Sequence, residues 1–462
     1  MTITSFRHLW LVAAVAAAPH ASAQQRLEVG LDDLFALADG TSLQIRISET
    51  AHDVSAEGVK AARSRRRPDV NLSLSGSYIG TATVMSRGFS RKGSTTIPYA
   101  TGVGEVSNGR QPTPHWGNDL VAQVTQVIYA GGALTAGIRM AEQGERVARL
   151  DVERNRQEVR FLLAGHYLEL CKLSNQLEVV QRNIDLTERV LATMRARHAQ
   201  GTVLRNDITR YELQLKSQQL RERQLQDAGQ VINHELVTML HLADSTLLQP
   251  RQPESTLTLG EAAAGLVVSR GEGDWQQLAA IANVSLQQAS LTVGMSQQAL
   301  RVARSATRPV VTLVAGNRLS GPYLNDFIPV DANVHAWYVG LGVSYDLGSL
   351  WRSHHEVKQA RSRVQQSREQ EELAREGVTH AVQAAYVTLQ TSLVEVETQQ
   401  KQAALADEHY QVTHNRYGQG LALLTDMLDA SHTKLTADME LVNARISLLY
   451  NYYKLKYLTH TL

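Results

Sequence analysis

The fold is decided by a stretch of sequence that occurs twice. It reads KAARSRRRPDVNL at residues 60–72 and RVARSATRPVVTL at residues 301–313, and seven of the thirteen positions are identical. In both copies a helical pattern stops at a proline, Pro68 or Pro309, because proline lacks a backbone N–H and restricts the residue before it. Apolar and polar residues then alternate, which indicates a strand. We therefore expect two copies of one structural plan.

The repeat continues downstream at a constant spacing of 219 residues, without a gap. Identical residues at this spacing are Val124 and Val343, Tyr167 and Tyr386, Leu170 and Leu389, Arg197 and Arg416, Gln200-Gly201 and Gln419-Gly420, and Asp207 and Asp426. The first copy carries extra residues before Val124, in a stretch at about 82–118 that is rich in Gly, Ser, Thr and Pro. This composition, with no hydrophobic period, predicts a loop.

Hydrophobic periodicity and glycine turns divide each copy further. The first repeat, 24–243, is expected to hold a helix at about 31–67, strands at about 69–81 and 119–128, a long helix 134–200 and a return helix 203–243. The second repeat, 275–462, is expected to hold a helix at about 275–308, strands at about 310–320 and 335–347, a long helix 350–417 and a return helix 421–458. Residues 244–274, rich in Pro, Gly, Ser and Thr, are predicted to link the repeats.

The pattern of the first 23 residues predicts that the protein is exported from the cytoplasm. An apolar run from Leu9 to Ala18 precedes Ala21-Ser22-Ala23, which is an A-x-A cleavage pattern, so residues 1–23 are expected to be a signal peptide. No later stretch has 18 consecutive apolar residues, so a membrane-embedded part would have to consist of strands. Roughly ten residues of dyad alternation, as in 335–347, suit such a strand. The net charge of +1 excludes bulk binding to nucleic acid.

The order helix, strand, strand, long helix, glycine turn, helix, found twice, resembles the TolC-like outer membrane efflux protein family. The most specific stretch is Arg416-Tyr417-Gly418-Gln419-Gly420-Leu421, followed by Thr425-Asp426-Met427-Leu428-Asp429-Ala430. The resemblance implies a mostly α chain with a membrane β-barrel portion. In this architecture three chains contribute four strands each to a 12-stranded barrel, which is continued by a long periplasmic helical barrel. It also implies location in the outer membrane of a Gram-negative cell, with extension into the periplasm.

The resemblance implies the exit duct of a tripartite efflux pump that passes small molecules outward. The implied partners are two further copies, a periplasmic adaptor, an inner-membrane transporter and outer membrane lipid. Asp426 and Asp429 match the acidic constriction of the tunnel entrance, although spacing alone also fits a capping or solvated pair. Asp207 and Tyr417 match residues that hold the entrance closed. The turns that match the adaptor contact are Gln200, Gly201, Thr202, Gln419, Gly420 and Leu421.

One departure from the family affects the expected entrance. Ala422 stands where the best-known members carry an arginine, so the ion pair of their closed entrance is not expected here. Two alternatives to efflux stay open: an exit duct for type I protein secretion, and a non-channel periplasmic coiled-coil or adaptor protein. We expect no enzyme activity, cofactor or metal, because His354-His355-Glu356 lacks a suitably spaced third ligand and no nucleophile–base pair stands out.

Overall fold

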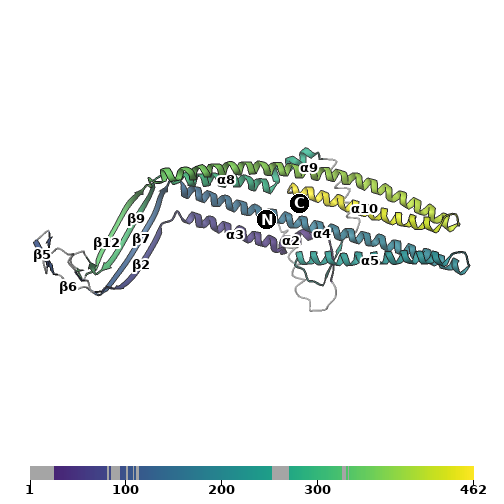
Figure 1. Ribbon diagram of the computed structural model, residues 1–462, viewed down its shortest axis with the longest axis horizontal. Coiled ribbons are helices and arrows are strands. Elements are labelled where there is room, and N and C mark those ends of the chain that lie inside the picture. Colours follow the sequence, from purple (N-terminus) through teal and green to yellow (C-terminus); the bar gives the residue numbers. More distant parts are fainter. Residues whose placement is uncertain are drawn as a thin grey trace, which may run out of the picture. The chain divides into compact units, whose positions relative to one another are not determined.

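The computed structural model describes residues 25–80, 83–84, 94–99, 102–107, 109–110, 114–251, 270–324, 329–330 and 332–462. The expected signal peptide, parts of the 82–118 loop and most of the 244–274 linker lie outside the described residues. Long helices dominate the described part (Figure 1). None of the helices within these ranges combines the length and the apolarity that a membrane span requires.

The described elements follow one order twice (Figure 1). The first passage is α2 (Leu31–Thr41), α3 (Leu43–Ser64), β2 (Asp69–Tyr78), β7 (Trp116–Ala130), α4 (Ala133–Ala199) and α5 (Arg205–Met239). The second is α7 (Glu272–Ala282), α8 (Val284–Ser305), β9 (Val310–Gly321), β12 (Val334–Ser344), α9 (Ser349–Gly418) and α10 (Leu424–Leu458).

The chain forms two compact units that do not coincide with the two repeats. Unit 1 is formed by the described residues of Met1–His52, Ala148–Ala289 and Glu371–Leu462, and unit 2 by those of Asp53–Val147 and Ser290–Gln370. Each unit thus combines corresponding segments from both repeats. The two repeats are therefore not two separate domains, because segments of one repeat pack against segments of the other in each unit.

Unit 2 contains a four-stranded antiparallel sheet in the order β12-β9-β7-β2. Hairpin partners β2 and β7 come from the first repeat, and β9 and β12 come from the second. The central pairing of β7 with β9 joins the repeats, with a bulge between Val127 and Tyr129. Within the described chain, β2 and β12 each pair along one edge only.

The register places apolar residues of all four strands on one face of this sheet. Leu341 lies opposite Leu313, Ala315 lies opposite Val124, and Val124 lies opposite Val70. On the outer strands β2 and β12 this face is uncovered by the described part of the chain: Leu72 is 69% exposed and Leu341 is 70% exposed. An uncovered apolar sheet face of this extent requires an apolar environment or a partner.

The opposite face of the sheet is polar. Arg318 of β9 donates two hydrogen bonds to the carboxylate of Asp119 on β7, at 2.8 and 3.0 Å. Tyr338 of β12 covers Gly316 of β9, because a Cβ added to Gly316 would lie 2.5 Å from the Tyr338 ring. Alternation with period two therefore separates an apolar face from a polar face, as the sequence predicts.

Unit 1 is formed mainly by the long helices. Its largest core gathers buried residues of α2, α4, α5 and α10, and includes Leu34, Leu163, Leu236 and Leu449. A parallel strand pair, β1 (Gln25–Val29) with β8 (Thr246–Pro250), adds to this core. Strand β8 lies in the stretch that the sequence predicts as a linker.

Two local features differ from the sequence-based expectation. Each initial helical stretch is two helices, because the backbone turns extended at Ser42 (ψ 122°) and at Asn283 (ψ 118°). The side-chain amide of Asn283 stabilises the break between α7 and α8, since its Oδ1 accepts a hydrogen bond from Leu286 N–H and its Nδ2 donates one to the carbonyl oxygen of Leu458.

The expected 82–118 loop contains short strands, among them the hairpin of β4 (Ser94–Tyr99) with β5 (Gly102–Ser107). Backbone pairing can form there without an apolar period.

Candidate functional site at the helix turns

The turn after α4 and the turn after α9 lie at the same end of unit 1 (Figure 1). Both have the same hydrogen bonds. Thr202 N–H donates to Arg197 O and Gly201 N–H to His198 O, while Leu421 N–H donates to Arg416 O and Gly420 N–H to Tyr417 O. This six-to-one and five-to-two pattern is the Schellman motif, which satisfies the last carbonyls of a helix.

Both turn glycines have a left-handed backbone. The φ angle is +79° at Gly201 and +77° at Gly420. A Cβ added at either position would meet nothing within 4 Å. Glycine is therefore required here for its backbone conformation and not for close approach of another group.

A side chain connects the two turns. Arg197, in the last turn of α4, donates a hydrogen bond from Nη2 to the carbonyl oxygen of Gly418 at 3.0 Å. Gly418 is the last residue of α9, so the guanidinium lies where the partial negative charge of that helix end is greatest. The sequence marked Arg197 only as the repeat partner of Arg416, and nothing in that match predicted the contact.

A common core lies behind the two turns. Buried residues from all four long helices form it: Val190, Leu191, Met194, Ile208, Tyr211, Tyr410, Leu424, Met427 and Ala430. Burial raises the pKa of Tyr410 to about 12. The Tyr211 hydroxyl is buried without a hydrogen-bond partner in the described chain, so this core contains a polar group whose hydrogen bonding is not satisfied.

Asp207 and Tyr417 lie close enough to interact electrostatically. Burial raises the pKa of Tyr417, the negative charge of Asp207 raises it further, and the positive charge of Arg197 lowers it. Both side chains are partly buried, at the start of α5 and at the end of α9. Asp207 belongs to the first repeat and Tyr417 to the second, so the fold brings together two residues that are far apart in the sequence.

Asp426 and Asp429 are exposed on the first turns of α10. Asp426 also accepts a hydrogen bond through Oδ2 from the backbone N–H of Leu423, at 3.1 Å. It therefore caps the helix, which is the simpler of the two roles that its spacing allowed. The cap leaves the carboxylate exposed, so it does not decide whether the pair also narrows a tunnel.

The predicted adaptor-contact residues are all exposed: Gln200, Gly201, Thr202, Gln419, Gly420 and Leu421. Three leucines at these turns are also uncovered, with exposed fractions of 71% for Leu204, 64% for Leu421 and 70% for Leu423. The sequence singled out only Leu421. Leu204 and Leu423 could have been found as matching apolar residues directly before the two return helices.

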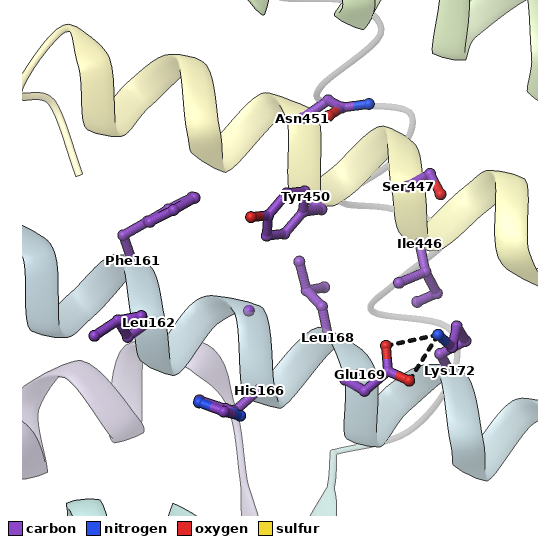
Figure 2. A pocket seen from close by; sticks show the side chains of 11 residues that line it. Phe161, Leu162, His166, Leu168, Glu169, Lys172, Ile446, Ser447, Tyr450 and Asn451 are labelled. Carbon is purple, nitrogen blue, oxygen red and sulfur yellow. Dashed lines mark hydrogen bonds and ion pairs between the residues drawn. The ribbon is translucent and has the colours of Figure 1, made fainter. Parts of the chain in front are cut away.

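A separate cavity of about 430 Å³ lies between α4 and α10 (Figure 2). Phe161 of α4 faces Tyr450 of α10 there, with ring centroids 5.5 Å apart. The charged groups Glu169 and Lys172 are paired with each other at 2.6 Å. Across the described ranges, no three His, Cys, Asp or Glu side chains are placed to hold a metal ion. The cavity is thus lined mainly by aromatic and apolar side chains, and the charges of Glu169 and Lys172 neutralise each other.

Comparison with known proteins gives relatives of one kind. TolC from Salmonella enteritidis, named as an outer membrane protein, is 26% identical over 185 residues, which are 39% of this chain and 38% of that protein. OpmQ from Pseudomonas aeruginosa, named as a pyoverdine export outer membrane protein, is 26% identical over 305 residues. That match covers 62% of this chain and 58% of OpmQ. The matched stretches thus span about two-fifths and three-fifths of these relatives.

The fold is shared with solved outer membrane proteins over a longer range. The crystal structure of VceC from Vibrio cholerae matches 93% of this chain and 96% of its own, with a TM-score of 0.72 at 16% identity. The expected mostly helical fold with four long strands per chain is confirmed by this match and by the described elements. The family described as outer membrane efflux protein matches residues 34–240 and 275–459. The chain therefore belongs to the outer membrane efflux protein family.

Proposed function

We propose that this protein forms, as a homotrimer, the duct through which an efflux pump releases small molecules across the outer membrane. An inner-membrane transporter and a periplasmic adaptor deliver the substrate to its helical end. The observation that carries the proposal is the four-stranded sheet with one apolar uncovered face, one polar face and two open edges. Lipid suits the first face, and a water-filled lumen suits the second.

The open edges support a trimer. Backbone N–H and C=O groups on the free sides of β2 and β12 cannot stay unpaired in hydrocarbon. If β2 of one copy pairs with β12 of the next, three sheets close into a 12-stranded barrel with no free edge. The Arg318–Asp119 ion pair then faces the lumen, where water can reach it.

The long helices support the same assembly. Helix α5 carries uncovered apolar residues seven apart, Leu213 and Leu220, and α9 carries Val387 and Val394 at the same spacing. Exposed fractions range from 51% for Val387 to 67% for Leu213. A heptad spacing is the pattern by which one helix packs along another. In the trimer, α5 of one copy packs beside α9 of its neighbour.

The helix turns support docking of the adaptor. Three leucines, Leu204, Leu421 and Leu423, are uncovered beside the left-handed glycines of the two turns. An apolar group at the tip of the partner would bury them. Asp207, Tyr417, Asp426 and Asp429 then surround the passage that the partner must open.

Small-molecule efflux is preferred over protein secretion because OpmQ, one of the relatives, is named for pyoverdine export. The test uses cells that lack this protein and then receive it on a plasmid. We expect restored resistance to small toxic compounds, together with an outer membrane band that runs as a trimer when unheated. Restored secretion of a protein substrate without resistance would favour the type I duct. A soluble monomer in the periplasmic fraction would overturn the channel itself.

A further inference from the structure

A basic groove lies between α8 and α9 in unit 2. Its volume is about 470 Å³. Arg304 of α8 and Thr307, just beyond the end of that helix, line one side of it, and α9 contributes Ser353, His354, Lys358 and Arg361. Ser353 is buried and small, which leaves room at the floor between the two helices. His354, Lys358 and Arg361 are spaced by four and three residues, so they share one face of α9.

The charge of this groove is not neutralised within the described chain. Its lining includes no Asp or Glu. None of Arg304, Lys358 and Arg361 forms an ion pair with another residue of the described ranges. By contrast, nearby Arg352 is paired with Asp346 at 2.6 Å. Three cations that converge on an open groove without a carboxylate favour an anionic ligand.

The groove lies beside the ends of two strands. Helix α8 ends at Ser305, just before β9 begins at Val310, and α9 begins at Ser349, just after β12 ends at Ser344. Uncovered apolar residues lie after β12 and in the first turn of α9, with exposed fractions of 61% for Leu347 and 69% for Trp351. An exposed tryptophan close to the end of an apolar strand face is typical of the boundary between membrane and water.

The backbone of α9 does not provide the anion site. Ser349 N–H donates to Asp346 O, Leu350 N–H to Leu347 O and Arg352 N–H to Gly348 O. These amides of the first turn are thus already hydrogen-bonded. An anion at this point would be held by side chains, above all by the guanidinium groups, which can each donate two hydrogen bonds to one phosphate.

We propose that this groove binds the phosphate of an anionic phospholipid from the membrane leaflet that adjoins the helices. The inference rests on the proposed placement of the strands in a membrane. Arg304, Lys358 and Arg361 hold the phosphate, while Leu350 and Val357, which also line the groove, contact the glycerol and the first acyl carbons. Each bound lipid thereby fixes the height of the sheet in the bilayer.

The experiment uses the purified full chain in a neutral detergent. Phosphatidylglycerol or phosphatidylcholine is added, and native mass spectrometry counts the lipids that stay bound. The test variant is Arg304→Gln with Lys358→Gln and Arg361→Gln. The control variant, Arg210→Gln with Lys216→Gln and Arg221→Gln, removes the same charge from α5, away from the groove lining.

We expect the wild-type protein and the control to retain phosphatidylglycerol in preference to phosphatidylcholine. The test variant should bind phosphatidylglycerol roughly a hundredfold more weakly, since each cation near an anionic membrane surface contributes about fivefold. Added salt should weaken the wild-type preference as well. Equal lipid retention by the test variant would overturn the proposal, and so would displacement of the lipid by an equal concentration of inorganic phosphate.

Conductance of the same preparation in planar bilayers separates this inference from the proposed function. A conducting protein without preference for phosphatidylglycerol contradicts the lipid site alone. A protein that neither conducts nor binds lipid contradicts the channel.

Discussion

Arg197 Nη2 lies 3.0 Å from the carbonyl oxygen of Gly418, so the end of α4 is tied to the end of α9 within one chain. The two residues come from different repeats, and each lies within four residues of its turn glycine, Gly201 or Gly420. Ala422 cannot make a polar side-chain contact in this region. Arg197 connects the two turns through this hydrogen bond.

Replacing Arg197 with Gln should loosen the turns and raise the resting conductance several-fold. The hydrogen bond is charge-assisted, and its loss costs about 1.5 kcal/mol. Planar-bilayer recordings of the purified protein measure this effect. Arg416→Gln is the matched control, because it makes the same change at the equivalent position of the other repeat. An equal rise in both variants would show that net charge, and not the contact with Gly418, controls the resting state.

Asp429→Asn should weaken the block of conductance by divalent cations without loss of stability. If three copies bring their Asp426 and Asp429 side chains to one axis, six carboxylates attract cations from the helical end, and acid removes the block as they protonate. Asp426→Asn should weaken the block and also the helix cap, at a cost of about 1 kcal/mol. Conductance with cation added from each side, beside thermal unfolding, separates the two effects. Unchanged block in the double variant would place the constriction elsewhere.

Gly201→Ala and Gly420→Ala should each destabilise their turn by roughly 1 to 2 kcal/mol, since an L-residue is strained in the left-handed region. Hydrogen exchange of the turn amides should therefore speed up, and efflux should fall while the trimer persists. Gly229→Ala in α5 is the control, because the added methyl group also meets nothing within 4 Å but the backbone is helical. That variant should be neutral or more stable by about 0.5 kcal/mol. Loss of trimer in step with efflux would assign the turn glycines to folding.

Leu220→Asp on α5 should prevent trimer formation, and so should Val394→Asp on α9. Each would place a charge in a helix contact between copies, at a cost of several kcal/mol. Their exposed fractions within one chain are 60% and 64%, so the fold of the single chain should survive. Gln230→Asp, exposed elsewhere on α5, is the control. Unheated gel electrophoresis and circular dichroism report assembly and fold separately, and trimers at the wild-type level would exclude this contact.

Asp438→Asn should stabilise the protein at neutral pH. Burial raises the pKa of Asp438 above its ordinary value of 3.8. The positive charge of Lys434 lowers this pKa, and the negative charge of Asp407 raises it. A raised folded-state pKa means that its contribution to stability is present at acid pH and is lost as the pH rises through that pKa. Asn does not ionise, so the Asp438→Asn variant should not lose stability in this way as the pH rises. Asp407→Asn is the opposite case, because it removes the ion-pair partner of Lys434 and should destabilise. Thermal unfolding from about pH 4 to pH 8 measures both, and a lower melting temperature for Asp438→Asn at neutral pH would contradict the burial argument.

The sequence by itself determined the order of the elements and the faces of the strands. The alternation of Trp337, Val339 and Leu341 with small or polar residues fixes which side of β12 is apolar, because side chains alternate along any strand. The turns at Gly201 and Gly420 were also readable, since few residues other than glycine adopt a left-handed backbone. These are local properties, encoded within a few neighbouring residues.

Only the tertiary structure decided how the two repeats divide their roles. Asp207 and Asp426 are equivalent in the repeat, yet Asp426 caps its own helix while Asp207 acts on Tyr417 of the other repeat. Arg197 likewise reaches Gly418, although the sequence match pairs it with Arg416. Such contacts join residues about two hundred positions apart. They depend on how the long helices pack around their shared core, and periodicity along a single helix carries no information about which neighbour its side chains will meet.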